Sequence, residues 1–198
     1  MNDRLASIIT AIDQANARDP NSVSLEGAKE PAEFVYSKRM SAMLDRFAPE
    51  ASEFLKIAAR AQHIERWTSA RSAYPDGRIG YLRWRTDLKN YHAERTGEIM
   101  SASGYGEAEI ARVKALIRKE KLKYDSDAQT LEDVVCLVFL EDYLAEFSEK
   151  HDEAKVIDIL RKTWGKMSAK AQATATGMIF PAAISRLISR ALINERMT

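Results

Sequence analysis

Histidine, cysteine and a buried aspartate are the side chains of this sequence that could hold a metal ion or move a proton. The three histidines are His63, His92 and His151, and the one cysteine is Cys136. No histidine has a second histidine four residues away, so the spacing of a structural zinc site is absent. Asp133 falls on an apolar helical stripe, where a buried carboxylate needs a partner such as an arginine, a histidine or a metal ion. Its alternative role is that of an acid near a helix start, which favours the helix dipole and caps backbone amides.

Arginine and aromatic side chains gather within residues 60–95, and their chemistry suits phosphates and nucleobases. The planar guanidinium group binds phosphate oxygens in pairs, and an indole ring stacks on bases. The sequence therefore predicts a phosphate or nucleotide clamp made of Arg66, Trp67, Arg71, Tyr74 and Arg78. The alternative is a loop in which the arginine side chains donate hydrogen bonds to backbone carbonyls.

Apolar residues recur at three- and four-residue spacing along most of the chain, which predicts the helices that must position these groups. Residues 20–30 are expected to form a polar connector, and Pro75-Asp76-Gly77 predicts a turn. There is no internal repeat and no long linker, so the sequence predicts a single compact all-α domain over residues 1–198. We expect eight or nine helices, at about residues 3–17, 31–47, 49–67, 79–100, 107–122, 128–149, 152–164, 168–177 and 181–194.

Composition excludes several classes of protein. The chain has 8 Gly and 5 Pro, too few for a collagen-like or low-complexity chain, and its 30 bases and 29 acids argue against a wholly basic nucleic-acid module. The charges are nevertheless uneven: residues 60–95 and 112–123 are basic, whereas residues 125–153 hold ten acids and one base. Basic clusters attract anions such as phosphates. The alternative is that the charged helices pair with one another or face solvent.

The ends and the apolar runs give expectations about location. The N-terminus has no uninterrupted apolar stretch of the kind found in signal peptides. The longest apolar runs, 134–140 and 178–184, are far shorter than the roughly 20 residues that span a bilayer. The single cysteine cannot form an intrachain disulfide, which favours a reducing compartment. We therefore expect a soluble, cytoplasmic protein with no membrane partner.

Many of the residues that carry a family resemblance lie close together in the middle of the chain. These residues are Arg60, Gln62, His63, Arg66, Trp67, Arg71, Tyr74, Pro75, Arg78, Gly80, Tyr81, Trp84, Arg85 and His92. The downstream stretch Leu131-Glu132-Asp133-Val134 fits the same pattern. With these residues the chain resembles the uncharacterised domain-of-unknown-function 4202 family over nearly its whole length.

The layout of that family is similar to that of the HD-type helical phosphohydrolases, so the resemblance implies an HD-domain-like fold. It also implies one divalent metal ion of unknown identity, held by His63, His92 and Asp133. Ala93 stands where an HD site has its bridging aspartate, and Glu94, one position later, points about 100° away around the helix. The catalytic candidates are Glu94, the two lysines Lys119 and Lys121, which lie where some HD enzymes keep a further histidine, and Glu132.

Two classes of function follow, with a third beside them. The first is a metal-dependent phosphohydrolase for a phosphorylated small molecule or nucleotide, with Arg66, Arg71, Arg78 and Arg85 binding phosphate. The second is a non-catalytic module that binds a nucleotide or RNA, with Trp67 stacking on a base. The third is a protein-interaction scaffold, whose partner could be a second copy of the chain.

Overall fold

The computed structural model describes residues 3–25 and 27–193, and the all-α class is confirmed there. Ten α-helices lie in this part of the chain, rather than eight or nine. The difference arises within the helix expected over residues 128–149. There a π-helical segment, η3 (Phe139–Tyr143), separates α6 (Ser126–Val138) from α7 (Leu144–Lys150). The sequence of this segment is as apolar and helix-compatible as its flanks, so periodicity did not predict the change in helical pitch.

The chain divides into two compact units, Met1–Leu131 and Glu132–Thr198. The boundary falls inside α6, which begins in the first unit and ends in the second. Each unit is described by itself below. The expectation of a single domain over residues 1–198 stays a prediction.

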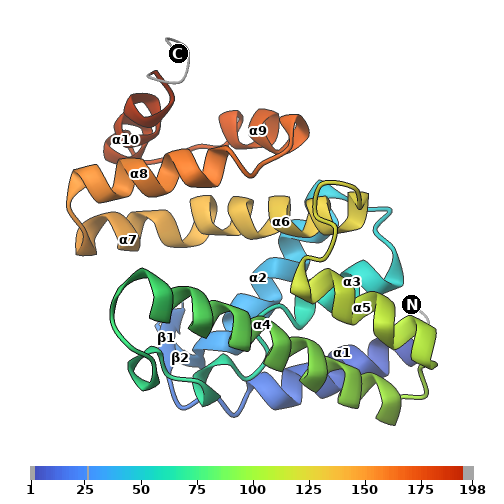
Figure 1. The fold of residues 1–198 in the computed structure, drawn as a ribbon. Helices are drawn as coiled ribbons and strands as arrows, with labels where there is room; N and C mark the ends of the chain where they lie inside the picture. Colours follow the sequence, from blue (N-terminus) through green and yellow to red (C-terminus); the bar gives the residue numbers. More distant parts are fainter. Residues whose placement is uncertain (1–2, 26, 194–198) are drawn as a thin grey trace. The chain divides into compact units, whose positions relative to one another are not determined.

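Helices make up most of the first unit. They are α1 (Asp3–Asn16), α2 (Ala32–Phe47), α3 (Glu53–Arg60), α4 (Gly77–Ala102) and α5 (Glu107–Arg118). Helix α3 contacts α1, α2 and α5, and α4 contacts α1 and α5 (Figure 1). Fully buried side chains fill the space between them: Ile8, Ile12, Met40, Leu44, Leu55, Ile57, Met100, Leu116 and Ile117. This core supports both α4 and the turn that follows α3.

A short β-hairpin replaces the polar connector expected over residues 20–30. Strands β1 (Ser22–Leu25) and β2 (Ala28–Pro31) pair antiparallel, with Leu25 opposite Ala28. Gly27 has φ 86°, a conformation that glycine adopts without strain. The carboxylate of Asp19 accepts hydrogen bonds from the backbone N–H groups of Asn21 and Glu33, which ties the two ends of the hairpin. Each strand has only four residues, too few for alternating polar and apolar side chains to predict a hairpin.

The helix expected over residues 49–67 is shorter at both ends. Helix α3 begins at Glu53, because Ser52 caps it by accepting a hydrogen bond from the backbone N–H of Leu55. It ends at Arg60, and the chain continues as a turn and two short 3₁₀ helices, η1 (Arg66–Thr68) and η2 (Arg71–Ala73). The early end of α3 places His63 and Arg66 on an irregular segment rather than on a helix.

The second unit is a smaller group of helices. After α6 and α7 come α8 (Glu153–Trp164), α9 (Ala169–Thr176) and α10 (Ala182–Ile193). Helix α10 contacts α7 and α8 (Figure 1). The buried side chains of this unit include Leu137, Leu144, Val156, Leu160, Ala171 and Ala191.

The longest helix, α4, has 26 residues and carries charged side chains along its length. Among the described residues, 3–25 and 27–193, no helix combines the length and the apolar character that crossing a membrane requires.

Gly80, in the first turn of α4, has no room for a side chain. A Cβ atom there would lie 1.9 Å from the backbone oxygen of Pro75. We expect Gly80→Ala to lower the free energy of unfolding by about 1–3 kcal/mol, because the backbone must move to relieve the overlap. A urea titration measures this change.

The matched control is Gly165→Ala, where the nearest atom would be 3.5 Å away. We expect its free energy of unfolding to stay within about 0.5 kcal/mol of the wild type. Equal stability of the Gly80→Ala and wild-type proteins would contradict the close approach of Pro75.

Candidate functional site

The turn after α3 is fixed by a residue in an unusual conformation. Glu65 has φ 50°, in the left-handed region that non-glycine residues adopt infrequently. Its backbone N–H donates to Oδ1 of the buried Asn16 at 3.1 Å. Its carboxylate accepts hydrogen bonds from the hydroxyl of Tyr91 at 2.8 Å and from Nε of Arg95 at 2.9 Å. Contacts from α1 and α4 therefore hold the turn in place.

Helix α4 faces this turn, and side chains from both line a pocket within the first unit. The turn contributes Gln62, His63 and Arg66, and α4 contributes Arg85, Leu88, Lys89 and His92. The structure thus brings together four of the residues predicted as site members. These four are His63, His92, Arg66 and Arg85.

His92 is held in one tautomer by the turn. Its Nδ1 lies 2.7 Å from the carbonyl oxygen of Ile64. A carbonyl can only accept a hydrogen bond, so Nδ1 carries the proton and Nε2 of the neutral ring is an acceptor. Nε2 is buried and has no hydrogen-bond partner among the described residues. The pocket therefore contains an unused lone pair on an imidazole ring.

Both histidines are neutral at neutral pH. Burial, together with the nearby charges of His63, Arg66 and Arg85, lowers the pKa of His92 to about 3. Burial also holds the pKa of His63 well below its usual value, and Arg66, Arg85 and Lys119 lower it further. An anion bound among these cations would oppose their effect and raise the pKa of both rings.

His63 sits between an aromatic ring and a carboxylate. Its ring stacks on Tyr36 with centroids 4.2 Å apart, and its Nδ1 lies 3.6 Å from Oε2 of Glu33. Burial raises the pKa of Glu33 to about 7, although the charge of Arg66 opposes this. The centroids of the His63 and His92 rings are 5.9 Å apart.

The two arginines of the pocket have few anionic partners. The Arg66 guanidinium lies 5.2 Å from the centroid of a Trp84 ring, and its Nη1 is 3.9 Å from Oε1 of Glu33. Arg85 makes no hydrogen bond or ion pair within residues 3–25 and 27–193. Lys89 adds a third positive side chain to the lining. The local charge therefore favours an anionic ligand.

The other predicted clamp residues do not line this pocket. Arg71 donates from Nη1 to the carbonyl oxygen of Tyr74 at 2.9 Å, as the alternative of an arginine-tied loop expects. The Tyr74 hydroxyl donates to Asp87 at 3.1 Å. Trp67 is half-buried and Arg78 is exposed. Their assignment to substrate binding stays a prediction.

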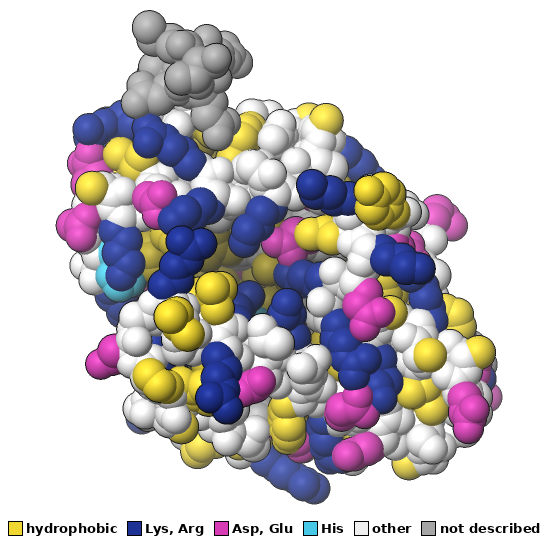
Figure 2. Space-filling model, viewed as in Figure 1, with side chains coloured by type: hydrophobic (Ala, Val, Ile, Leu, Met, Phe, Trp, Pro, Cys, Tyr) yellow, Lys and Arg dark blue, Asp and Glu magenta, His cyan; other side chains and the backbone are white. Residues whose placement is uncertain are grey.

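The basic stretch of residues 112–123 meets acidic side chains on the surface of the first unit. Glu94 pairs with Lys114 and Arg118, which joins α4 to α5. Over these helices Lys and Arg side chains stand among Asp and Glu side chains (Figure 2). This is the pairing of charged helices that the sequence left open as an alternative.

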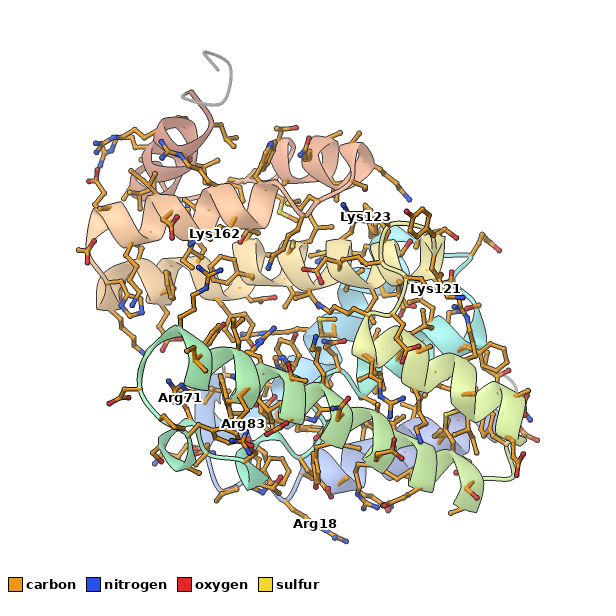
Figure 3. The ribbon with its side chains drawn as sticks, viewed as in Figure 1. Arg18, Arg71, Arg83, Lys121, Lys123 and Lys162 are labelled. Carbon is orange, nitrogen blue, oxygen red and sulfur yellow. The ribbon has the colours of Figure 1, made fainter. Side chains whose placement is uncertain are left out.

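The four catalytic candidates occupy different places. Glu94 is on the α4–α5 surface, where its ion pair and hydrogen bond with Lys114 lower its pKa. Lys119 and Lys121 lie in the loop after α5, with φ 59° and 53°, and Figure 3 shows Lys121 together with Lys123 there. Glu132 is buried in the second unit, where its Oε1 lies 3.7 Å from Nζ of Lys166. None of the four lines the pocket, so their catalytic role stays a prediction.

Asp133 is buried, as its place on an apolar stripe predicts. Within the second unit its Oδ1 accepts from the backbone N–H of Ser168 at 2.8 Å, and its Oδ2 accepts from the Ser168 hydroxyl at 2.5 Å. Ser168 in turn caps α9 by accepting from the N–H of Ala171. The carboxylate thus supports the start of α9. The alternative drawn from the sequence had placed it near the start of its own helix.

A metal site of three protein ligands is not formed by the described residues. Residues 3–25 and 27–193 contain no group of three or more His, Cys, Asp or Glu side chains that could hold a metal ion. His63 and His92 belong to the first unit and Asp133 to the second. Their shared role as metal ligands stays a prediction.

Comparison with protein-family models tests the family resemblance seen in the sequence. The model of a domain of unknown function, DUF4202, matches residues 6–188. The chain belongs to the DUF4202 family. Searches of curated proteins and of solved structures find no match to it. The resemblance stated from the sequence is therefore confirmed for the family, while the HD-like layout of this DUF4202 protein stays a prediction.

Two polar residues of the site were missed by sequence reasoning. Gln62 lines the pocket, and Glu33 approaches His63 from the start of α2. Gln62 stands beside His63 in the family pattern, and that proximity was the available signal. Nothing in the sequence near Glu33 indicates that it reaches the site, because the contact depends on how α2 packs.

The low pKa of His92 predicts how stability responds to acid. Below about pH 6.5 the unfolded chain binds a proton on this residue that the folded protein binds only near pH 3. His92 should therefore account for about 2 kcal/mol of the stability lost between pH 7 and pH 5. Glu33, whose folded pKa is raised to about 7, gains stability as pH falls over the same range, so wild type and variant must be compared.

The measurement is the free energy of unfolding at pH 7 and pH 5 for wild type, His92→Gln and His151→Gln. We expect His92→Gln to lose about 2 kcal/mol less than wild type between these pH values. The control His151→Gln, altered in the second unit, should follow the wild type. The same pH response in all three proteins would show that His92 is not held in a neutral, buried state.

Proposed function

We propose that this DUF4202 protein binds the phosphate group of a phosphorylated small molecule or nucleotide in the pocket of its first unit. The observation that carries the proposal is Arg85, a pocket-lining guanidinium with no partner among residues 3–25 and 27–193. Arg66 and Lys89 stand beside it in the same lining. Guanidinium groups match phosphate geometry and form short, charge-assisted hydrogen bonds with it.

The neutral histidines support an anion in the pocket. Two protonated imidazole rings would be repelled by the three cations of the pocket. The low pKa values of His63 and His92 keep both rings neutral and avoid this repulsion. When a phosphate binds, its charge opposes that of the arginines and so raises the pKa of His63 and His92. The carboxylate of Glu33, 3.6 Å from Nδ1 of His63, offsets part of the positive charge of the pocket.

Arg85 and Arg83 form a matched pair for testing phosphate binding. They are neighbours on α4, but Arg85 lines the pocket, whereas Arg83 is 76% exposed and pairs with Asp87 (its place is labelled in Figure 3). We expect Arg85→Ala to weaken the binding of AMP and of inorganic phosphate at least about tenfold, the loss of a charged hydrogen bond. Arg83→Ala should change either affinity less than about twofold.

Isothermal titration calorimetry measures the affinity of wild type, Arg85→Ala and Arg83→Ala for AMP and for inorganic phosphate. Failure of the wild type to bind either ligand, or an equal loss in both variants, would overturn the proposal.

A second candidate function is metal-dependent phosphohydrolysis in an HD-like layout, and one observation favours it. His92 donates Nδ1–H to a backbone carbonyl and leaves Nε2 bare, which is how proteins orient a metal-binding histidine. His63 and His92 would hold the ion, with Asp133 as the further predicted ligand. A divalent ion in such a site lowers the pKa of a bound water and neutralises phosphate charge.

Metal binding separates this candidate from phosphate binding alone. We expect one equivalent of Mn²⁺ or Zn²⁺ to bind the wild type, and His92→Ala to weaken that affinity at least about tenfold. His151→Ala keeps the wild-type affinity, because it alters a histidine of the second unit outside the pocket. Elemental analysis and calorimetry measure both quantities. If no ion binds the wild type, the hydrolytic candidate fails and the phosphate proposal is unaffected.

A further inference from the structure

Unpaired acceptor atoms gather at the phosphate pocket. The buried side-chain atoms without a hydrogen-bond partner among the described residues are Oε1 of Gln62, Nε2 of His92 and Oε2 of Glu33. Gln62 and His92 line the pocket, and Glu33 Oε2 lies 3.6 Å from Nδ1 of the lining His63. Buried polar atoms of native proteins are almost always hydrogen-bonded, so three such atoms at one site point to a bound partner.

The chemistry of these atoms says what the partner must offer. His92 cannot donate from Nε2, because its proton is engaged on Nδ1 by the Ile64 carbonyl. Gln62 is 5% exposed, and neither the oxygen nor the nitrogen of its amide makes a hydrogen bond within the described chain. A ligand that fits must therefore supply hydrogen-bond donors as well as negative charge. A dianionic phosphate has acceptors only and leaves Nε2 of His92 unsatisfied.

The aromatic rings argue against a nucleobase as the rest of the ligand. The Trp84 ring is already approached by the Arg66 guanidinium, and the Tyr36 ring is stacked on His63. Trp67 is not part of the lining. A base would have no free ring to stack on within the pocket, whereas hydroxyl groups would meet the unpaired acceptors directly.

We propose that the ligand of this pocket is a small phosphate monoester carrying hydroxyl groups, such as a polyol or sugar phosphate. Its phosphate lies against Arg66 and Arg85, and its hydroxyls donate to Nε2 of His92 and Oε1 of Gln62. The inference rests on the proposed phosphate binding and names the class of molecule that brings the phosphate.

Two ligands of the same charge and nearly the same size test the role of the hydroxyls. Glycerol phosphate carries two hydroxyls, and n-propyl phosphate carries none. We expect chelator-treated wild-type protein to bind glycerol phosphate at least about tenfold tighter than propyl phosphate in calorimetry, because buried acceptors reject an analogue that cannot donate. The chelator ensures that Nε2 of His92 is not occupied by an ion.

A glutamine variant assigns the preference to the pocket. We expect Gln62→Met, which keeps the length of the side chain, to reduce the preference to less than about threefold. Gln14→Met, at an exposed position of α1, keeps the wild-type preference. The wild-type comparison needs no variant, so it decides the question even where Gln62→Met does not fold.

The outcomes separate this inference from the proposal beneath it. Equal affinity of wild type for the two esters, or a preference that requires added Mn²⁺, overturns the hydroxylated ligand while phosphate binding stands. Tighter binding of AMP than of glycerol phosphate also overturns it. If neither ester nor inorganic phosphate binds, the phosphate pocket itself is wrong.

Discussion

The hydrogen bond from His92 Nδ1 to the Ile64 carbonyl joins the two halves of the pocket, and the remaining geometry depends on it. It fixes α4 against the turn that carries Gln62 and His63. It also decides which nitrogen of the ring holds the proton. The carbonyl can point at His92 because the next residue, Glu65, takes a left-handed conformation that Asn16, Tyr91 and Arg95 stabilise. Backbone strain at one residue is thus balanced by three hydrogen bonds, as is common where a structure must position a functional group.

One set of charges explains several properties of the pocket. Arg66 and Arg85 supply the positive charge on which the proposed phosphate binding rests, and the same two side chains lower the pKa of both histidines. The pocket therefore combines fixed positive charge with neutral rings. If the proposed phosphate binds, its charge raises the pKa of the rings, so that ligand binding and histidine protonation are coupled without any change of fold.

Sequence periodicity predicted the helices well where each helix packs along its whole length. Helices α1, α2 and α4 lie close to the expected ranges, whereas the hairpin and the early end of α3 were missed. These features depend on bonds between distant residues, such as Asp19 to the backbone of Glu33. Spacing along the chain carries no information about such bonds.

For the candidate site too, the sequence predicted what depends on residue type and spacing, and not what depends on contacts in the folded protein. Residue type and spacing singled out His63, His92, Arg66 and Arg85, which line one pocket in the structure. They could not find Gln62 as a pocket residue, because its significance is an unpaired oxygen in the folded protein. They also assigned Arg71 to phosphate, which stays a prediction; in the structure its guanidinium donates to the Tyr74 carbonyl.

The bond between Asn16 and the backbone of Glu65 also bears on the order of folding. The two residues are 49 positions apart, and the contact closes a loop that contains the hairpin, α2 and α3. Closing so long a loop costs entropy that local helix formation does not, so contacts of this kind form late. The helices of the first unit can therefore form before the pocket does. The binding site would then be among the last parts of the unit to mature during folding and the first to be lost when α1 detaches.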